Sequence, residues 1–594
     1  MDLHFTDDQP TPEEREAIDA FLASHTPQGD LRQYLLPVLH AIQGRVGWIS
    51  LGALNHACRA LDVPPADAFG VADFYAMFQT RPHPPVAIHV CDDIGCQFHP
   101  GNTAEALCAQ VAQSGVPWHR SPCLGLCERA PAALVTMAGK PPREASVAPA
   151  TVESVLAVLD VPGVLDVPSP NLAASVPQIG QPGLTLLRRI GRIDPWSLDD
   201  YRAAGGFLAL RRAFEMGPDR VVDEVIEAKL VGRGGAAFPT GLKWKGMRSA
   251  PLPRYLVCNA DESEPGTFKD RVLMEGDPYS LIESMIIAGF ATGCERGYLY
   301  IRGEYPLATD LLDNAIRRCR ERGFLGEDIL GDGVRFDIEL RRGAGAYICG
   351  EETALLNSLE GYRGEPRNKP PFPTQVGLFG QPTAINNVET LVNVLPIVLE
   401  GGKAFASIGT ERSTGPKLFC LSGHVRRPGV YEVPFGVTLR EVLELAGGVT
   451  GRLQAILLGG AAGAFITPDQ IDVPLTFEGT RAIGAALGSG VIMPFDDTVD
   501  LRLVLRRIAQ FFRDESCGQC VPCRVGTVRQ EEVLHRLATD RPFGSVEQEL
   551  ALVKELGQVM RDASICGLGQ TASSAIESAL ARFPKYLQIG QEKR

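Results

Sequence analysis

The sequence predicts a multidomain α/β protein whose chain ends in a bundle of helices. The chain has 594 residues, and because one domain usually holds about 100–200 residues, about three to five domains are expected. Helix-like and strand-like segments alternate along its middle. Eight of its 15 cysteines stand in two clusters far apart in the chain, which indicates that different domains carry them.

The composition is that of an ordinary globular protein, with 45% hydrophobic and 22% charged residues. The net charge of -13 argues against a nucleic-acid partner, because nucleic-acid-binding domains usually carry a basic stripe. No apolar run approaches the roughly 18–20 residues that span a bilayer, so no direct membrane insertion is expected. The acidic start lacks the basic and apolar regions of a secretory signal. A cytoplasmic location is therefore the expectation.

Residues 1–82 are predicted to be a helical region, because apolar residues recur every three or four positions in PEEREAIDAFLASH and LRQYLLPVLHAIQGRVGWI. Residues 83–160 are predicted to form a small α/β domain. Its strands are VAIHVC and PAALVTM, its helix is TAEALCAQVAQ, and cysteines stand in loops at the strand ends. Residues 161–184 are rich in Pro, Ser and Gly without periodicity, which predicts a linker.

In residues 185–415, helices alternate with strands such as RYLVCNAD and RGYLYIRGEY, and long Gly- and Pro-rich loops interrupt them. Loops of that length inside a compact domain are usually functional. Residues 416–500 have the pattern of strand, turn, strand and helix, which predicts a small β-rich insert. Residues 501–594 contain the amphipathic segments LVLRRIAQFF, VRQEEVLHRLA and ELALVKELGQVM, which predict the helical bundle.

The later cysteine cluster has the spacing of a four-iron site. Cys517, Cys520 and Cys523 follow the pattern C-x2-C-x2-C, so one loop can wrap three corners of a cubane. A cubane needs four soft thiolates, and Cys566 is the only later cysteine in the chain. A structural zinc ion is more often held by two separate C-x2-C pairs. The cubane is the favoured prediction, with zinc and uncoordinated thiols as alternatives.

The earlier cluster consists of two cysteine pairs on separate loops. Cys91 and Cys96 form a C-x4-C pair, and Cys123 and Cys127 form a C-x3-C pair. This arrangement suits a two-iron cluster, in which each iron takes two thiolates, and zinc is again the alternative. Two unlike clusters in one chain favour iron-sulfur clusters that act as successive sites on an electron-transfer path. The other seven cysteines are scattered, and we expect them to be buried as small apolar side chains.

Four loops in the middle of the chain have residue types that suit phosphate, ribose and flavin ring atoms. Residues 232–245, GRGGAAFPTGLKWK, offer backbone N–H groups and Lys243 to phosphate. Residues 259–270 cluster carboxylates and an amide directly after a strand, residues 343–373 add glycines, glutamates and KPPF, and residues 383–390 add paired amides. Each loop alone is a moderate signal, since glycine clusters often only make turns. Together they predict a flavin and dinucleotide site.

These segments, together with ESCGQCVPC, resemble the flavoprotein NADH-oxidising subunit of respiratory complex I and its relatives, over about residues 185–590. Residues 11–160 resemble the thioredoxin-like two-iron subunit that partners it, here fused to its N-terminus. The β-rich insert resembles a soluble-ligand-binding β-grasp domain. The resemblance implies a thioredoxin-like [2Fe-2S] domain, an α/β domain for FMN and NAD(H), the β-grasp insert, and a helical bundle with a [4Fe-4S] cluster.

The resemblance also assigns roles to individual residues. Glu264 and Glu352 are the candidates for a catalytic role. Ala237 departs from the family, which usually has a glycine there. NAD(H) contacts are implied at Gly235, Phe238, Glu264, Glu352, Lys369 and Phe372, with the phenylalanines stacking on adenine. FMN contacts are implied at Gly232, Gly234, Lys243, Asn259, Asp261, Glu262, Tyr347, Gly350, Glu351, Asn386 and Asn387.

Among the relatives, the chain looks most like the β subunit of molybdenum- or tungsten-dependent formate dehydrogenase, because of DDYRAAGGFLAL, MRDASICGLGQTASS and the close spacing of the first two cysteine pairs. The partner would then be a formate-oxidising molybdenum or tungsten α subunit with further Fe-S clusters. The diaphorase subunit of an NAD-reducing hydrogenase, with hydrogenase subunits as partners, is the second interpretation, and complex I is the third. An alternative from another class is a non-catalytic iron-sulfur carrier or assembly subunit, which predicts no bound flavin.

Overall fold

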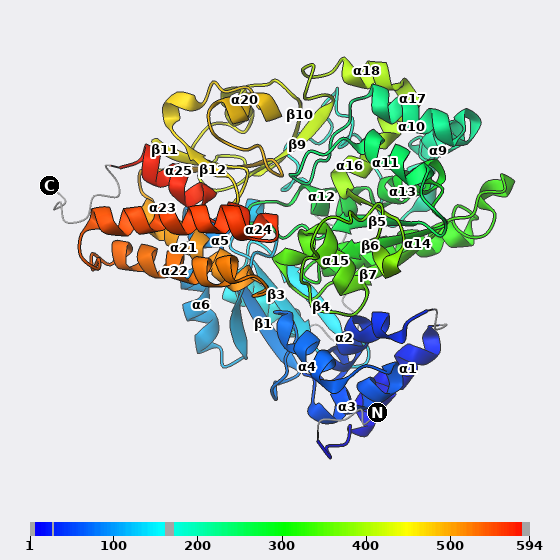
Figure 1. Ribbon diagram of the computed structural model, residues 1–594, viewed down its shortest axis with the longest axis horizontal. Coiled ribbons are helices and arrows are strands. Elements are labelled where there is room, and N and C mark those ends of the chain that lie inside the picture. The colour runs from blue at the N-terminus through cyan, green and yellow to red at the C-terminus, as the bar shows by residue number, and fades with distance from the viewer. Residues whose placement is uncertain (1–5, 26–28, 102, 161–171, 585–594) are drawn as a thin grey trace.

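The computed structural model describes residues 6–25, 29–101, 103–160 and 172–584 (Figure 1). Three β-sheets organise the described part of the chain. In Figure 1 the N-terminal helices lie at the bottom, the second sheet and its helices lie at the right, and the third sheet and the C-terminal helices lie at the left. This multidomain α/β architecture confirms the predicted fold class.

The N-terminal region is helical, as predicted: α1 (Pro12–Ser24), α2 (Leu35–Val46), α3 (Leu51–Leu61) and α4 (Pro65–Phe74). The side chain of Thr11 accepts from the backbone of Glu14, whose side chain accepts from the backbone of Thr11. This capping box satisfies N–H groups that the first turn of α1 leaves free. The last helix ends at Phe74, and turns lead from there to the first sheet.

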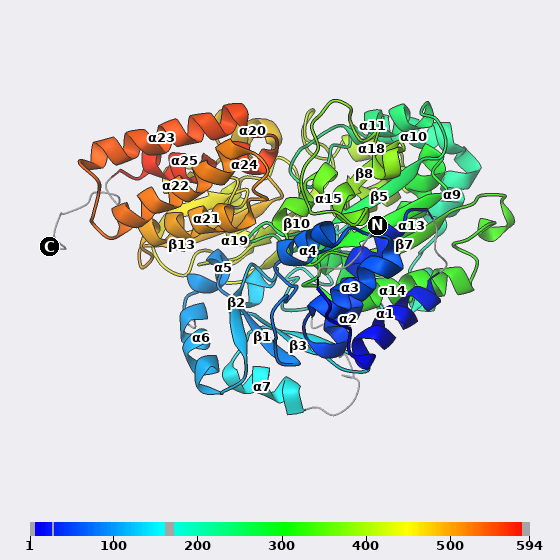
Figure 2. The ribbon, with the colours of Figure 1, turned by 60° about the horizontal axis from the view of Figure 1, so that its bottom comes forward.

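The first sheet has four strands in the order β2-β1-β3-β4. Strands β1 and β2 are parallel, and β3 is antiparallel to both β1 and β4. Figure 2 shows α5 against α21 (Leu501–Glu515) of the C-terminal bundle, above α6. The strands are β1 (Val86–Cys91), β2 (Trp118–Ser121), β3 (Ala133–Met137) and β4 (Arg143–Val147), with helices α5 (Ile94–Gln97), α6 (Ala104–Gln113) and α7 (Val152–Asp160).

The second sheet is parallel, with strand order β7-β6-β5-β8. The chain builds β5, β6 and β7 outward in one direction and then returns to place β8 on the other side of β5. The border between β5 and β8 is therefore a topological switch point, where open α/β sheets bind ligands beyond the carboxyl ends of their strands. The strands are β5 (Tyr255–Ala260), β6 (Arg296–Ile301), β7 (Asp337–Arg342) and β8 (Thr383–Asn387).

Helices cover this sheet, and the longest apolar one is buried almost throughout. In α13 only Phe290 escapes full burial, because a helix that is apolar on every side is stable only inside a core. The helices of this domain are α8 (Leu198–Ala203), α9 (Leu208–Met216), α10 (Pro218–Glu227), α11 (Thr240–Arg248), α12 (Lys269–Gly276), α13 (Pro278–Thr292), α14 (Pro306–Glu321), α15 (Glu352–Leu359), α16 (Val388–Val392), α17 (Val394–Glu400) and α18 (Gly402–Ala406).

The third sheet has five strands in the order β10-β9-β13-β11-β12, and the C-terminal helices follow it. None of the helices in the described part of the chain combines the length and apolarity needed to cross a membrane. The strands are β9 (Pro416–Leu421), β10 (Gly429–Pro434), β11 (Leu453–Leu458), β12 (Ala464–Ile466) and β13 (Val491–Asp496). The helices are α19 (Leu439–Leu445), α20 (Phe477–Ala482), α21 (Leu501–Glu515), α22 (Val521–Ala538), α23 (Val546–Ala563), α24 (Gly567–Thr571) and α25 (Ser574–Arg582).

The described part of the predicted linker, residues 172–184, contains no helix or strand, but it is packed against the third sheet. The carbonyl of Ser175 accepts from the backbone of Val430 at 2.7 Å. The side chain of Gln178 exchanges two hydrogen bonds with the backbone of Glu432. Composition predicted the lack of regular structure and gave no sign of this packing. Residues 161–171 of the predicted linker lie outside the described residues.

Candidate functional site

A cavity of about 430 Å³, which we call the main cavity, lies at the carboxyl edge of the second sheet, where β5 and β8 end. Its walls come from the loops of the second sheet, the loops of the third sheet and the segment that begins α24. Two other cavities, of about 250 and 680 Å³, border α2 and contain none of the predicted site residues. The predicted residues that line the main cavity are Gly234, Gly235, Asn259, Asp261, Glu262, Glu264, Tyr347, Gly350, Glu351 and Asn387.

Glycines bring the backbone to the wall of the main cavity. A Cβ atom on Gly350 would lie 3.4 Å from the carbonyl oxygen of Asp261. Gly235 has a φ of +122°, which residues with side chains rarely adopt. Ala237 also lies in the left-handed region, with a φ of +53°, at a cost of about 1 kcal/mol. The left-handed backbone at position 237 explains why glycine is the usual residue there, where this chain has Ala237.

Two asparagines on neighbouring strands line the main cavity. Asn259 and Asn387 are register partners on β5 and β8. The Asn259 amide donates to the carbonyl of Gly350 at 2.9 Å, and the Asn387 amide donates to Asp270 at 2.6 Å. The Oδ1 atom of Asn387 is buried and accepts no hydrogen bond from the described residues. An unpaired buried acceptor costs about 1–3 kcal/mol, so this atom fits a ligand that donates an N–H or O–H group, as a flavin and its ribityl chain do.

Three of the predicted FMN residues support the wall from outside the main cavity. Gly232 closes the glycine loop through a backbone hydrogen bond. The ammonium of Lys243 donates to the carbonyl of Ile385 at 2.8 Å, and burial lowers its pKa. The Oδ1 atom of Asn386 accepts from the indole of Trp244 at 2.9 Å. Asn386 and Asn387 therefore point to different partners, because successive residues of a strand face opposite sides.

The carboxyl groups in the main cavity are shielded from water. Burial raises the pKa of Asp261 well above its ordinary value. Burial also raises the pKa of Glu262 to about 7, although two backbone N–H groups at the start of α12 donate to it. Burial raises the pKa of Glu264 to about 7, against hydrogen bonds from Tyr347 at 2.5 Å and the backbone of Ala462 at 3.0 Å. Protonated carboxyl groups at such sites can donate to ligand acceptors as well as accept.

The Glu264→Gln variant is expected to flatten the dependence of stability on pH. The pKa of Glu264 rises from an ordinary 4.5 to about 7 in the folded chain. The folded chain therefore holds a proton that the unfolded chain releases near pH 4.5, so this contribution is complete below pH 4.5 and is lost as the pH rises through 7. The loss is on the order of 3 kcal/mol. Urea unfolding of the cofactor-free chain at pH 5 and pH 7.5 measures it.

Glu400→Gln at the exposed end of α17 provides the matched control for this prediction. The control is expected to keep the wild-type difference in urea midpoint between the two pH values. A Glu264→Gln variant with the full wild-type difference would contradict the buried, protonated state of Glu264.

Two of the predicted NAD(H) residues outside the main cavity, Glu352 and Lys369, lie beside its wall residue Glu351, and we call these three charged residues the rim. Lys369 pairs with Glu351 at 2.9 Å and with Glu352 at 3.0 Å. Glu351 also caps α15, since its side chain accepts from two backbone N–H groups of the first turn. Phe238 and Phe372 are 55% and 53% exposed. Exposed aromatic rings and a lysine that can exchange its carboxylate partners both suit a nucleotide that binds and leaves.

The four cysteines of the earlier cluster are buried together at one end of the first sheet. Cys123 and Cys127 lie with their sulfur atoms 3.5 Å apart. Cys91 lies within hydrogen-bonding reach of Cys96 and Cys123. A Cβ atom on Gly95 would lie 3.2 Å from the sulfur of Cys127, so a glycine is needed beside these thiols. The two predicted pairs therefore form one set of four thiols.

The later cluster forms between two helices of the C-terminal bundle. Cys517, Cys520 and Cys523 stand before and within the first turn of α22, and Cys566 directly precedes α24. Burial raises the pKa of Cys523, and the charges of the other three thiols add to this effect. The two residues that follow Cys566 line the main cavity. The predicted four-iron site therefore borders the predicted flavin site.

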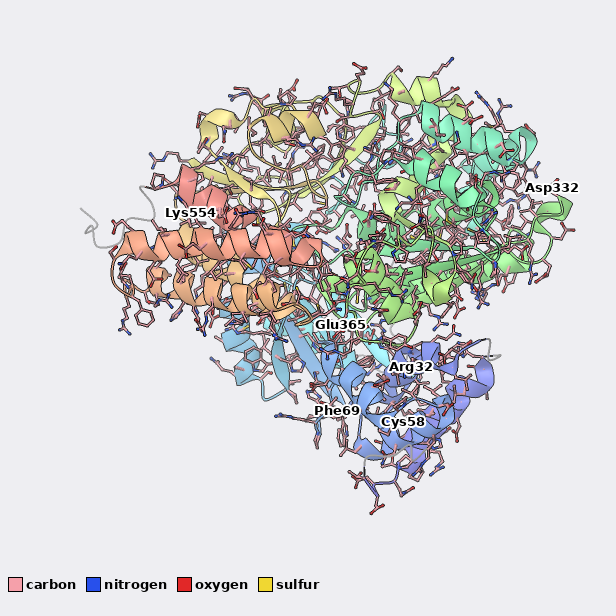
Figure 3. All side chains as sticks on the ribbon, in the orientation of Figure 1. Arg32, Cys58, Phe69, Asp332, Glu365 and Lys554 are labelled. Carbon is pink, nitrogen blue, oxygen red and sulfur yellow. The ribbon has the colours of Figure 1, made fainter. Side chains whose placement is uncertain are left out.

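The other seven cysteines are all buried, as predicted. Figure 3 shows Cys58 within the N-terminal helices. Among the described residues, no group of three or more His, Cys, Asp or Glu side chains is arranged to hold a single metal ion.

Several residues of the main cavity were not predicted from the sequence. Ala462, Gly488 and Ser489 come from loops of the third sheet. The glycine run GGAAGAF after β11 was a usable signal for the first of these loops. Glu515 accepts from the backbone of Tyr347 at 2.8 Å and so ties the cluster loop to the cavity wall. No local pattern marks that contact, because it joins residues far apart in the chain.

Comparisons with protein families match each region of this chain. Residues 225–396 match the Nuo51 FMN-binding domain, and residues 503–589 match the NADH-ubiquinone oxidoreductase-F iron-sulfur binding region. Residues 18–160 match the thioredoxin-like [2Fe-2S] ferredoxin family, and residues 418–460 match the SLBB domain. FMN, [2Fe-2S] and [4Fe-4S] domains are therefore present, and the prediction of these cofactors is confirmed.

Individual relatives agree with these matches. The second F-type subunit of NADH-quinone oxidoreductase in Rhizobium meliloti (strain 1021) is 47% identical over 405 residues, which is 67% of this chain and 95% of that protein. NADP-reducing hydrogenase subunit HndC of Solidesulfovibrio fructosivorans is 44% identical over 400 residues, which is 67% of this chain and 81% of that protein. A chain of an NAD+-reducing [NiFe]-hydrogenase in the H2-reduced state aligns with a TM-score of 0.79 at 32% identity, covering 95% of this chain and 94% of that chain. This chain therefore belongs to the family of F-type NADH-quinone oxidoreductase subunits, the NADH-oxidising diaphorase subunits that carry FMN and iron-sulfur clusters.

Proposed function

We propose that this chain exchanges hydride with NAD(H) at the main cavity and passes electrons through the cluster at Cys517, Cys520, Cys523 and Cys566. One observation carries the proposal: the residues after Cys566 line the same cavity as the flavin-type loops of the second sheet. FMN, when bound, supplies exchange of hydride with nicotinamide and of single electrons with iron-sulfur clusters. A non-catalytic iron-sulfur carrier would not need its cluster to border a flavin-type cavity.

In this proposal, the residues of the main cavity bind the flavin and the nicotinamide nucleotide and orient them. Asn259 and Asn387 hold the ring and ribityl groups from the ends of β5 and β8. The glycine loop brings N–H groups to the phosphate, and Lys243 adds positive charge behind it. Hydride exchange depends on close stacking of two rings more than on an acid or base. We therefore assign Glu264 and Glu352 to orienting the nicotinamide and ribose rather than to proton transfer.

Removing the rim charges through the double variant Lys369→Ala and Glu352→Ala is expected to raise KM for NADH about tenfold, or about 1.4 kcal/mol. Lys369 holds both rim glutamates at salt-bridge distance, so its loss leaves Glu351 facing an anionic nucleotide. Steady-state NADH:ferricyanide kinetics provide the measurement, and iron content and visible spectra are expected to stay unchanged.

The matched control removes one glutamate and one lysine from an exposed site, Glu400→Ala with Lys403→Ala. It is expected to keep the wild-type KM. An unchanged KM in the rim variant would show that the NAD(H) assignments at Glu352 and Lys369 are wrong.

For the partner, we propose a formate-oxidising molybdenum or tungsten subunit with further Fe-S clusters, so that the chain reduces NAD+ with electrons from formate. The stretches DDYRAAGGFLAL and MRDASICGLGQTASS support this proposal by their resemblance to formate dehydrogenase β subunits. A second candidate is a hydrogenase partner, which is supported by the nearly full-length match to a chain of an NAD+-reducing [NiFe]-hydrogenase.

The subunit that co-purifies with the tagged chain separates the two candidates. NAD+ reduction by the purified complex is measured with formate and, separately, with H2. The formate proposal predicts activity with formate and a molybdopterin-type subunit in the complex. Activity with H2 alone would replace it with the hydrogenase candidate.

A further inference from the structure

The loop between Cys123 and Cys127 is held from the second sheet by a buried arginine. Arg302 directly follows β6 and is 1% exposed. Its Nη2 donates to the carbonyl of Cys123 at 2.5 Å, and its Nη1 donates to the carbonyl of Glu262 at 2.6 Å. One guanidinium therefore joins a ligand residue of the first cluster to a residue that lines the main cavity.

Tyr305 and Arg271 also connect the loop between Cys123 and Cys127 to Glu262. The hydroxyl of Tyr305 donates to the Glu262 carboxylate at 3.1 Å, and a Cβ atom on Gly125 would lie 2.1 Å from this hydroxyl. Arg271 donates from Nε to the carbonyl of Gly125 at 2.9 Å and from its backbone to Glu262 at 2.9 Å. The loop therefore rests directly on side chains that also contact the cavity wall.

The charge of Arg302 lies close to the Cys123 loop, in surroundings from which water is excluded. Its partner is Glu304, with Nη2 and Oε1 2.7 Å apart and both side chains buried. Arg271 is paired with Glu128 and Glu275. Charges interact strongly where water is excluded, and hydrogen bonds to the ligands of a cluster tune its potential. Reduction adds one electron, and hence one negative charge, to the cluster, so a nearby cation favours the reduced state.

We propose that Arg302 is a positioning residue that fixes the Cys123 loop against the main cavity and raises the reduction potential of the two-iron cluster. This inference rests on the proposed function, in which electrons from NADH enter the chain at the main cavity. The same guanidinium contacts both the cavity wall and the cluster loop, so it holds the two against each other.

Redox titration of the purified chain, followed by electron paramagnetic resonance, tests the proposal. In Arg302→Met the equilibrium constant for one-electron reduction of the two-iron cluster is expected to fall at least about tenfold, or about 59 mV. Arg302→Lys keeps the charge and is expected to recover most of the shift. Arg341→Met is the matched control: it removes another buried arginine, on β7, that hydrogen-bonds Gln33, and it is expected to keep the wild-type potential.

Glu304→Gln tests the same effect with the opposite sign and without removing the arginine. Losing the paired carboxylate is expected to raise the potential of the two-iron cluster. An unchanged potential in Arg302→Met, an equal shift in Arg341→Met, or an unchanged or lower potential in Glu304→Gln would each overturn the role of Arg302. NADH:ferricyanide activity of the wild-type chain is measured in parallel, because its absence would overturn the proposed function itself.

Discussion

Replacing Gly350 with alanine is expected to weaken FMN binding strongly while leaving the chain folded. The added Cβ would make only ordinary contacts, 3.4 Å and 3.6 Å from atoms of Asp261, and Gly350 has no positive φ. The methyl group would occupy the wall of the main cavity, and overfilling a well-packed site costs about 1–3 kcal/mol. The Kd for FMN is expected to rise about 100-fold, or about 2.7 kcal/mol.

Fluorescence titration of the cofactor-free chain with FMN measures this change. The matched control is Gly246→Ala on α11, where an added Cβ meets no atom within 4 Å. The control is expected to bind FMN as the wild type does and to keep the same far-ultraviolet circular dichroism spectrum. Wild-type affinity in Gly350→Ala would show that the flavin lies elsewhere.

Replacing Cys566 with alanine is expected to eliminate the four-iron cluster and the exit of electrons to the partner. This cysteine closes the set begun by Cys517, Cys520 and Cys523, and the residues after it line the main cavity. The iron content is expected to fall by about four atoms per chain. NADH-dependent reduction of the partner subunit is expected to fall more than about 100-fold, whereas ferricyanide, which accepts electrons directly at the flavin, is still reduced.

Iron analysis, electron paramagnetic resonance and the two activities together test this expectation. Cys294→Ala is the matched control, because it removes a thiol that belongs to neither cluster from a more deeply buried position than that of Cys566. It is expected to keep all iron and both activities. A Cys566→Ala variant with the full iron content would mean that another group supplies the fourth ligand.

The cysteine ligands of the later cluster could be predicted from the sequence, because their spacing along one loop limits the geometry they can adopt. Cys517, Cys520 and Cys523 lie on one short segment, so their convergence follows from local chain geometry. Cys566 could be paired with them only because no other cysteine follows. The strand-end asparagines were predicted by resemblance, and the register of Asn259 with Asn387 gives the reason: parallel strands end at one edge.

Long-range contacts account for what the sequence did not predict. The contributions of Ala462 and Ser489 to the main cavity depend on how the third sheet packs against the second, which no local pattern encodes. The burial of Leu172, Ser175, Val176 and Gln178 is another case, since the composition of residues 172–184 is that of a linker. In the sequence, Arg302 looks like any charged residue after a strand. Its role could not be predicted because its two partners, Cys123 and Glu262, are distant from it in the chain.

Electrons from NADH are expected to reach the cysteine-bound clusters by way of the main cavity. The most direct test adds NADH to the purified, FMN-loaded chain without oxygen and records electron paramagnetic resonance spectra at low temperature. Signals of reduced iron-sulfur clusters are expected to appear with NADH in the wild-type chain and to be much weaker in Gly350→Ala. Clusters that dithionite reduces but NADH leaves oxidised in the wild-type chain would contradict this electron path.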